Sequence, residues 1–285
     1  MPDTLSENFI TRFAPSPSGR LHKGHAYSAL LAYRAALKNN GRFILRIEDI
    51  DTTRCKTEFM EGIYQDLRWL GLTWEEPVRK QSEHFSDYSE ALDKLKALGV
   101  VYPCFCTRKD IQAEIAAAER APHGPDGPLY PGICKKLALA EQTRLRADNQ
   151  PHAWRLDLSA ALKILSHPIS WYDQVCGLVP ATPEILGDIV LARKDTPTSY
   201  HLSVVVDDGL QNITHITRGK DLFHATHIHV VLQKLLGLPT PSYHHHALLT
   251  DNEGVRFAKR NKSVTLQDIQ GQGIDTATLI RSLGL

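Results

Sequence analysis

The chain has 285 residues, enough to bury a substantial core in one large domain or two modest ones. Hydrophobic residues make up 42% and charged residues 23% of it, a composition that excludes a disordered or fibrous protein. Lys and Arg number 33 against 32 acidic residues, so the net charge of +1 provides no global field for nucleic acid, and any RNA contact must be local.

The cysteines and the lack of targeting signals indicate a reducing compartment. The amino terminus has no basic segment followed by an apolar run, and no stretch approaches the roughly 18 apolar residues needed to span a bilayer. The five cysteines form an odd set, and Cys104 and Cys106 are too close for an ordinary disulfide framework, which favours reduced thiols or a metal site. We therefore expect a cytoplasmic protein with no membrane partner.

The first hundred residues alternate short apolar runs with helical patterns. They predict a strand at Phe9 to Phe13, a helix within Gly24 to Lys38 and a strand at Phe43 to Ile47, the rhythm of a parallel βαβ unit. Two amphipathic helices follow, at Phe59 to Leu70 and Tyr88 to Leu98. Three glycines are expected to end these helices: Gly41, Gly71 and Gly99.

From Cys104 onward the pattern changes, and we interpret the change as an inserted subdomain. An Ala-rich segment, Ile111 to Ala118, runs into a loop rich in Pro and Gly at Pro122 to Pro128. The α/β pattern then returns, with a predicted strand at Leu202 to Val206 and a helix at Thr226 to Leu236 that ends near Gly237. A further strand is expected around Ala247 to Leu249. Together these elements predict an interrupted nucleotide-binding fold.

The junction between the first strand and the first helix is suited to bind phosphates. Exposed amides and the positive end of the helix dipole favour an anion there, and Pro15, Pro17 and Gly19 would fix the loop that approaches it. His22 and His25 would lie near each other at the start of the helix. The glycine between them, Gly24, leaves room for a flat base.

The run His22, Lys23, Gly24, His25 resembles the His-Ile-Gly-His signature of class I aminoacyl-tRNA synthetases, with Lys at the second position. The resemblance implies an ATP site in which both histidines contact the triphosphate and Gly24 lies under the adenine, with Mg²⁺ accompanying ATP.

A second element of that class is a Lys-rich loop that neutralises charge as pyrophosphate leaves. Two registers are open in this chain, Arg256 to Arg260 with Lys259 as the key residue, and Lys259 to Ser263 with Lys262. We favour the first, because it keeps an apolar second position and a Lys at the fourth, although Arg256 and Ala258 replace the usual Lys and Ser.

A finer resemblance, to glutamyl-tRNA synthetases, is carried by the runs Arg12 to Ser18 and Arg46 to Thr53 and by the later runs Tyr200 to Asp208 and Ile216 to Asp221. A pocket for glutamate needs Arg for its carboxylates and an acid for its ammonium. Successive parallel strands would bring the first two runs to one rim. The resemblance implies these glutamate-binding residues, without settling which Arg holds which carboxylate: Arg12, Ala14, Ser16, Glu48, Tyr200 and Arg218.

Four residues resemble the zinc site of a short relative of these enzymes: Cys104, Cys106, Tyr130 and Cys134. Such a zinc ion would be structural and would close the loop. Tyrosine is an unusual ligand, and His123 remains an alternative for the fourth position. The run His244 to His246 alternates faces in a strand and cannot grip one ion, so we interpret it as structural or nucleotide-facing. Cys55 and Cys176 are also expected to be structural.

The match covers about Phe9 to Ser263 and stops before the anticodon-binding domains of full glutamyl-tRNA synthetases, which is the pattern of the glutamyl-Q tRNA(Asp) synthetase family. Val204 and Leu222 stand where ordinary glutamyl enzymes usually carry Asn and Trp. The resemblance implies an enzyme, expected to be a monomer, that activates L-glutamate with ATP without RNA and transfers it to queuosine in the anticodon of tRNA(Asp).

The implied fold class is α/β, a Rossmann-like catalytic core interrupted by a zinc-containing subdomain and ending in a short helical tail. The expected segments are 1–99 and 191–250 for the two halves of the core, 100–190 for an acceptor-binding-like insertion, and 251–285 for the Lys-rich loop and tail.

Three alternatives remain open at this point. A truncated glutamyl-tRNA synthetase would charge the 3′ end of tRNA(Glu). An inactive module that binds glutamate or ATP is suggested by the altered Lys23, Arg256 and Ala258. A nucleotidyltransferase would share the two-histidine motif but has no use for the glutamate-pocket residues.

Overall fold

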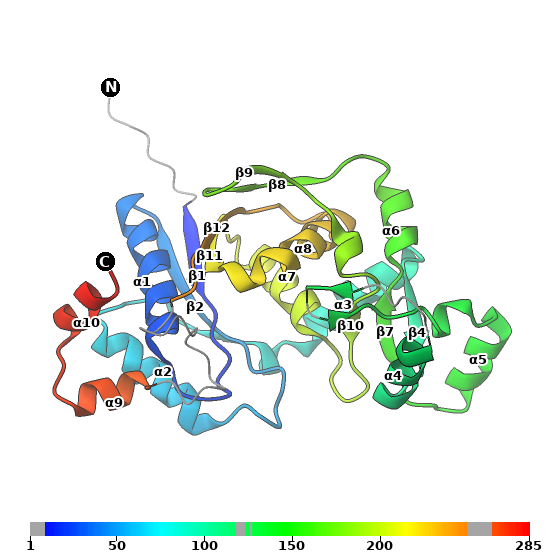
Figure 1. Ribbon diagram of the computed structural model, residues 1–285, viewed down its shortest axis with the longest axis horizontal. Helices are drawn as coiled ribbons and strands as arrows, with labels where there is room; N and C mark the ends of the chain where they lie inside the picture. The colour runs from blue at the N-terminus through cyan, green and yellow to red at the C-terminus, as the bar shows by residue number, and fades with distance from the viewer. Residues whose placement is uncertain (1–8, 118–122, 126, 250–263) are drawn as a thin grey trace.

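The computed structural model describes residues 9–117, 123–125, 127–249 and 264–285. Its centre is a seven-stranded sheet in the order β3-β2-β1-β11-β12-β8-β9 (Figure 1), in which neighbours are parallel except for the antiparallel pair β8 and β9. The strands are β1 (Ile10–Phe13), β2 (Arg42–Ile47), β3 (Arg79–Lys80), β8 (Ser170–Asp173), β9 (Gly177–Pro180), β11 (His215–Gly219) and β12 (Ser242–His246).

Helices cover both faces of this sheet. On one face lie α1 (Lys23–Lys38), α2 (Thr57–Trp69), α9 (Leu266–Gly271) and α10 (Thr276–Ser282), which share one apolar core, so the last helices of the chain pack beside the first (Figure 1). On the other face lie α7 (Tyr200–Leu210) and α8 (Phe223–Leu236), with α3 (Phe85–Ala97) packed against them. Of the described helices, none combines the length and the apolar character needed to cross a bilayer.

A second, three-stranded antiparallel sheet in the order β10-β7-β4 lies beside α7 and α3. Its strands are β4 (Val101–Cys104), β7 (Ala153–Leu156) and β10 (Val190–Ala192), and around it lie α4 (Arg108–Ala117), α5 (Leu139–Ala147) and α6 (Leu158–Leu165). Smaller elements are the hairpin β5 (His123–Gly124) and β6 (Gly127–Pro128) and the 3₁₀ turns Gln81–Glu83, Cys134–Lys136, Pro183–Ile185 and Lys220–Leu222. Residues 100–190 contribute to both large sheets, because β8 and β9 join the main one; the proposed segment boundaries stay a prediction.

The local patterns located most elements correctly. The expected strands at 9–13 and 43–47 are β1 and β2, and the expected helices at 24–38, 59–70 and 88–98 are α1, α2 and α3. α8 ends, as expected, at Gly237, whose φ of 68° is left-handed. The sequence pattern therefore located both amphipathic helices, such as α2 and α3, and short strands buried on both faces, such as β1 and β2.

Two predicted strands were wrong. Residues 202–206 lie in the middle of α7 and not in a strand. Every residue from Leu202 to Asp208 is buried, because the helix is enclosed by the main sheet, α3, α8 and the small sheet, so its sequence carries no helical alternation of polar and apolar residues. The strand expected at 247–249 is misplaced. The structure has strand β12 directly before it, at Ser242–His246, and residues 247–249 belong to no strand.

Gly41 does not serve as the left-handed cap of α1. That conformation belongs to Asn40, whose φ is 50°. The amide of Gly41 closes the turn by donating to the carbonyl oxygen of Ala36 at 2.8 Å. A Cβ on Gly41 would lie 2.1 Å from the carbonyl oxygen of Phe9, so glycine is required there by the close approach of the chain to the start of β1.

Candidate active site and metal centre

Four adjacent strands of the main sheet share one pattern on the face covered by α7 and α8. Each carries an apolar residue that packs in the core and, two positions later and nearer its carboxyl end, a buried polar residue on the same face. The pairs are Ile10 and Arg12 in β1, Ile44 and Arg46 in β2, Ile216 and Arg218 in β11, and Tyr243 and His245 in β12. The carboxyl-end half of the sheet therefore presents a row of cationic and imidazole side chains, at the edge where α/β folds bind ligands.

Arg12 and Arg46 converge on one carboxylate from α7. The Nε and Nη2 atoms of Arg12 donate to the two oxygens of Asp208 at 3.0 and 3.2 Å, and Nη1 of Arg46 donates to Oδ1 of the same residue at 2.9 Å. Arg46 also donates through Nη2 to Glu48 at 3.1 Å. Burial alone would raise the pKa of Asp208, but the charges of Arg12 and Arg46 outweigh it and hold this pKa below its usual range. The Nε atom of Arg46 also lies 3.6 Å from Asp207, so Arg12 and Arg46 are surrounded by three carboxylates.

The neighbouring carboxylate on α7, Asp207, anchors the helix to other parts of the fold. It accepts hydrogen bonds from Nε of Arg79 at 2.7 Å, from Nε2 of Gln81 at 2.7 Å and from the hydroxyl of Tyr88 at 3.0 Å. Burial and the charge of Asp207 raise the pKa of Tyr88, so its hydroxyl stays a donor. Asp207 fixes the position of α7, while Asp208 fixes the arginine pair.

Arg218 has a different environment, made of neutral groups. Its Nε donates to Nε2 of His245 at 3.1 Å, and its Nη1 lies 3.4 Å from the hydroxyl of Tyr200 and 3.4 Å from Nδ1 of His229. Its Nη2 donates to the hydroxyl of Thr226. The residue is only 5% exposed. A buried guanidinium whose direct partners carry no charge retains its full positive charge for an anionic ligand.

Glu48 and the loop after β1 lie beside these arginines. The amide of Glu48 donates to the carbonyl oxygen of Pro15 at 3.0 Å, which ties the end of β2 to the loop that contains Ala14 and Ser16. The hydroxyl of Ser16 lies 3.7 Å from the sulfur of Cys55. The structure therefore brings the predicted pocket residues of the first strand pair to one rim.

The two-histidine motif caps the start of α1. The Nδ1 atom of His22 accepts from the amide of Gly24 at 3.1 Å, and Nδ1 of His25 accepts from the amide of His22 at 3.1 Å, a reciprocal capping box. The two rings lie 3.8 Å apart between centroids. A Cβ on Gly24 would lie 3.1 Å from the ring of His22, so this position favours glycine. Both imidazoles are thereby held at the positive end of a helix, where an anion binds.

The chain returns to this motif after the Lys-rich segment. Thr265 forms an isolated antiparallel bridge with His22, and the amide of Leu266 donates to the carbonyl oxygen of Leu21 at 2.9 Å. Arg20 donates to the side chain of Gln267. The predicted loop residues themselves lie outside the described part of the chain: Arg256, Ala258, Lys259, Lys262 and Ser263.

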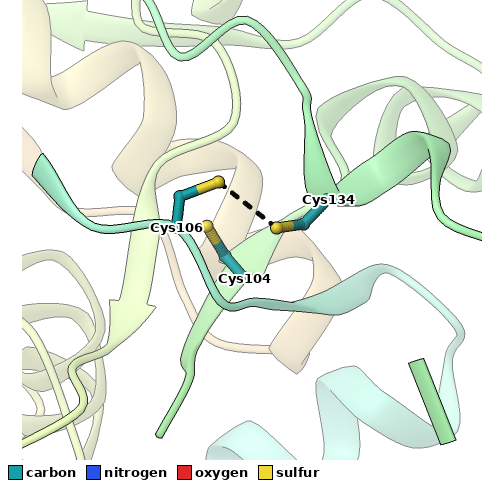
Figure 2. A group of neighbouring side chains, drawn as sticks. All are labelled: Cys104, Cys106 and Cys134. Carbon is teal, nitrogen blue, oxygen red and sulfur yellow. Dashed lines mark hydrogen bonds between the residues drawn. The ribbon is translucent and has the colours of Figure 1, made fainter. Parts of the chain in front are cut away.

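Three cysteines of the insertion meet at one point, between the end of β4 and a 3₁₀ turn (Figure 2). The sulfur atoms of Cys104, Cys106 and Cys134 all lie within 4.8 Å of one another, and those of Cys106 and Cys134 are 3.4 Å apart. In a tetrahedral thiolate site with metal–sulfur bonds of about 2.3 Å, the sulfurs are about 3.8 Å apart. The three thiols therefore have the spacing of metal ligands.

Tyr130 supplies a fourth donor to this cluster. Its hydroxyl lies 3.4 Å from the sulfurs of both Cys104 and Cys106 and accepts from the amide of Cys134 at 2.9 Å. The guanidinium of Arg155 lies over its ring, 3.9 Å from the centroid. The side chain of the alternative ligand, His123, lies outside what the structure describes.

The thiols do not ionise alike in the absence of a metal ion. Burial would raise the pKa of Cys104, but hydrogen bonding with Tyr130 and the charge of Arg155 lower it below its usual value. Burial and the neighbouring thiols raise the pKa of Cys106 to about 12. A bound metal cation would stabilise the thiolate forms of these cysteines, because the thiolate is the form that binds a metal ion.

A cavity of about 550 Å³ lies between the insertion and the start of α7. Tyr200 and His201, at the start of α7, line one wall, and Tyr130 of the cysteine cluster lines another. Three arginines also face it: Arg108, Arg155 and Arg193. This cavity can receive a second, anionic substrate beside the glutamate pocket predicted from sequence.

Three residues that now stand out received no role from the sequence, and a fourth, His245, was interpreted only as structural or nucleotide-facing. Arg46, Asp207 and Asp208 lay within the quoted runs but appeared as ordinary charged residues, and His245 was one of three consecutive histidines. The signal that could have found Arg46 and His245 is the polar residue two positions after a core residue, repeated in four strands.

Residues 8–285 match the family described as tRNA synthetases class I (E and Q), catalytic domain. The glutamyl-Q tRNA(Asp) synthetase of Rhodobacter capsulatus is 46% identical over 282 residues, 97% of this chain and 100% of the relative. The protein of the same name from Symbiobacterium thermophilum is 40% identical, over 95% of this chain and 84% of its own length.

The solved structures give the same fold. A glutamate tRNA ligase from Elizabethkingia meningosepticum, crystallised in complex with its amino acid, superposes with a TM-score of 0.77 at 29% identity, over 89% of this chain and 52% of the ligase. Methionyl-tRNA synthetase from Mycobacterium tuberculosis, at 12% identity and a TM-score of 0.62 over 96% of this chain and 63% of its own, shares the fold.

The interrupted α/β architecture, the capped two-histidine motif and the full-length sequence match agree. This chain belongs to the class I tRNA synthetases (E and Q) and carries their catalytic domain.

Proposed function

We propose that this chain activates glutamate with ATP to form glutamyl-adenylate without RNA, and then transfers the glutamyl group to queuosine in the anticodon of tRNA(Asp). The observation that carries the proposal is the burial of Arg12 and Arg218 toward the carboxyl ends of β1 and β11, the sheet edge at which the loop from β1 to the capped histidine motif begins. The relatives named for this activity, which match nearly the whole chain, support the choice of acceptor.

The charges of the pocket favour one orientation of glutamate. Arg218 has neutral partners and an uncompensated charge, so we assign it the side-chain carboxylate, with the hydroxyl of Tyr200 beside it. Arg12 is neutralised by Asp208 and serves the substrate as a hydrogen-bond donor near the α-carboxylate. Glu48 receives the ammonium group. It lies beside the loop after β1 that contains Ala14 and Ser16. Glutamine would leave the charge of Arg218 without a counterion.

ATP would bind at the start of α1. His22 and His25 face the triphosphate, and Gly24 lies under the adenine. Lys259 and the Mg²⁺ that accompanies ATP add positive charge. An oxygen of the glutamate α-carboxylate attacks the α-phosphorus, and the bond to pyrophosphate breaks. The developing charge needs only positioned cations and amides, so no protein nucleophile is required.

In the second step a hydroxyl of the queuosine cyclopentene diol attacks the carbonyl carbon of the adenylate. An ester forms, the bond to AMP breaks, and the hydroxyl proton leaves with the phosphate or solvent. The cavity beside Tyr200 and His201 has room for a nucleoside, and its arginines suit the flanking phosphates.

The cysteine cluster would hold a structural Zn²⁺ through Cys104, Cys106, Cys134 and Tyr130. When bound, such an ion ties the end of β4 to the turn at Cys134 and holds Tyr130 in the cavity wall.

The first half of the proposal is tested by glutamate-dependent exchange of pyrophosphate into ATP, with purified protein and no RNA. We expect exchange with glutamate and none with glutamine, and we expect R218Q to raise the KM for glutamate at least about 100-fold, because it removes a buried charge pair. Absence of exchange in the wild-type protein would favour an inactive binding module.

A further inference from the structure

The guanidinium of Arg218 is held along one edge by internal partners. Its Nε and Nη2 atoms, which form that edge, donate to Nε2 of His245 and to the hydroxyl of Thr226. The hydroxyl of Thr226 also lies 3.1 Å from Nε2 of His245 and can donate to it, so the two partners of this edge belong to one hydrogen-bonded group. Nη1, at the other end, has two contacts of 3.4 Å among the residues that the structure describes, to Tyr200 and His229. One edge is therefore fixed, and the end with the long contacts lies beside Tyr200, which lines the cavity next to the insertion.

The fixed edge determines the tautomer of His245. A guanidinium has donors only, so the Nε2 atom of His245 must accept and cannot carry a proton. The proton is then on Nδ1, which donates to Oδ2 of Asp173 at 2.7 Å. The side chains of His245 and Asp173 are 1% and 0% exposed. The hydrogen bonds thus run in one direction across three adjacent strands, from Arg218 in β11 through β12 to β8.

Asp173 is itself fixed by the backbone. Its Oδ1 accepts from the amides of Val175 at 2.9 Å and Cys176 at 3.0 Å, in the turn between β8 and β9, and its Oδ2 also accepts from the amide of His245 at 3.2 Å. The ring of His245 packs among the rings of Trp171, Phe223 and Tyr243. Hydrogen bonds therefore hold the carboxylate, and a hydrogen bond together with ring contacts holds the imidazole.

An imidazole holds an arginine without neutralising it. Arg12 is held along the same edge by Asp208, a charged partner, and its charge is balanced. Arg218 is held by neutral His245, and the negative charge of Asp173 is kept one ring away. Burial and the charge of Arg218 lower the pKa of His245 to about 4, although Asp173 opposes the shift, so the ring is neutral at pH 7. The other ionisable groups in contact with Arg218 are also neutral, because burial lowers the pKa of His229 and raises the pKa of Tyr200 and of Tyr243.

We propose that Asp173 and His245 are positioning residues for the glutamate site: they orient Arg218 so that its Nη1 end and its full charge face the substrate carboxylate. This inference rests on the proposed assignment of Arg218 to glutamate. It predicts that loss of the imidazole harms glutamate binding selectively, because the ATP motif on α1 lies on the opposite face of the sheet.

The test uses four variants of the full chain in the pyrophosphate-exchange assay. H245A should raise the KM for glutamate about 10- to 100-fold, the cost of a misplaced binding group, with the KM for ATP unchanged. H245Q should recover part of the loss, because its amide oxygen can accept from Nε of Arg218. D173N should give a smaller increase. The matched control is H227Q: His227 is also buried and packs on Trp171, but it bonds to the amide of Thr182 and does not contact Arg218.

The outcomes separate the two proposals. If the wild-type protein shows no glutamate-dependent exchange, the proposed function fails. If it exchanges normally and H245A changes neither KM, or changes the values for glutamate and ATP alike, the positioning role is wrong. Thermal melts identify a variant that does not fold; should H245A be such a variant, an unchanged KM for glutamate in both H245Q and D173N contradicts the inference.

Discussion

At the scale of single residues, the pocket shows how two arginines of similar burial acquire different properties. Arg12 and Arg218 are each 5% exposed and each held along the Nε–Nη2 edge. The charge of the partner decides whether the arginine is neutralised. The carboxylate of Asp208 offsets the charge of Arg12, whereas the neutral ring of His245 leaves the charge of Arg218 unbalanced. The sequence predicted both arginines but not this difference, because each partner is distant in the chain: Asp208 is 196 residues from Arg12, and His245 is 27 residues from Arg218.

Acidification should destabilise the fold through its buried histidines. Burial lowers the pKa of His245 to about 4 and that of His229 well below its ordinary value. The unfolded chain, with a histidine pKa near 6.5, therefore takes up protons between about pH 6.5 and 4 that the folded protein does not, and stability is lost as the pH falls through this window. For His245 alone the loss at pH 5 is about 2 kcal/mol.

Urea unfolding at pH 7, 6 and 5 measures this effect. We expect the free energy of unfolding of H245Q to fall less than that of the wild-type protein, by about 2 kcal/mol at pH 5. The variant H167Q, which changes an exposed histidine, should follow the wild type. Equal slopes for all three proteins would show that His245 is not buried in its neutral form.

At the scale of elements, the largest error of sequence reasoning has a clear physical cause. α7 was predicted as a strand because its apolar and β-branched run, Leu202 to Val206, shows no helical period; a helix buried on all sides has none to show. The same burial hid the function of Asp207 and Asp208, since charged residues in such a run have meaning only through the arginines they meet. Elements with a solvated face, such as α2 and α3, were predicted correctly.

The cysteine cluster should hold one metal ion per chain, and we expect zinc. Metal analysis of the wild-type protein and of C176S should each give about one ion, and C104S close to none. Cys176 is the matched control because it is exposed and lies outside the cluster. Removal of the ion by a chelator should lower the Tm of the wild-type protein by about 5 °C or more and leave that of C104S unchanged. Stoichiometric metal in C104S would show that the cluster is not the site.

At the scale of the whole molecule, the pocket exists because the sheet order brings distant segments together. β1 pairs with β11, and β11 with β12, so Arg12, Arg218 and His245 become neighbours along one sheet. The resemblance of short runs to a family anticipated the first two, together with Tyr200 and Glu48. It gave no indication of Asp173, because nothing local in residues 100–190 shows that β8 leaves the insertion and joins the main sheet.

The central claim is the identity of the acceptor, and one measurement tests it directly. The wild-type protein is incubated with ATP, labelled glutamate and one of three RNAs: tRNA(Asp) that contains queuosine, tRNA(Asp) that lacks it, and tRNA(Glu). We expect label only on the first RNA, and on its anticodon fragment after nuclease cleavage. Label at the 3′ end of tRNA(Glu), with none on the queuosine-containing RNA, would contradict the proposal and identify the chain as a glutamate–tRNA ligase.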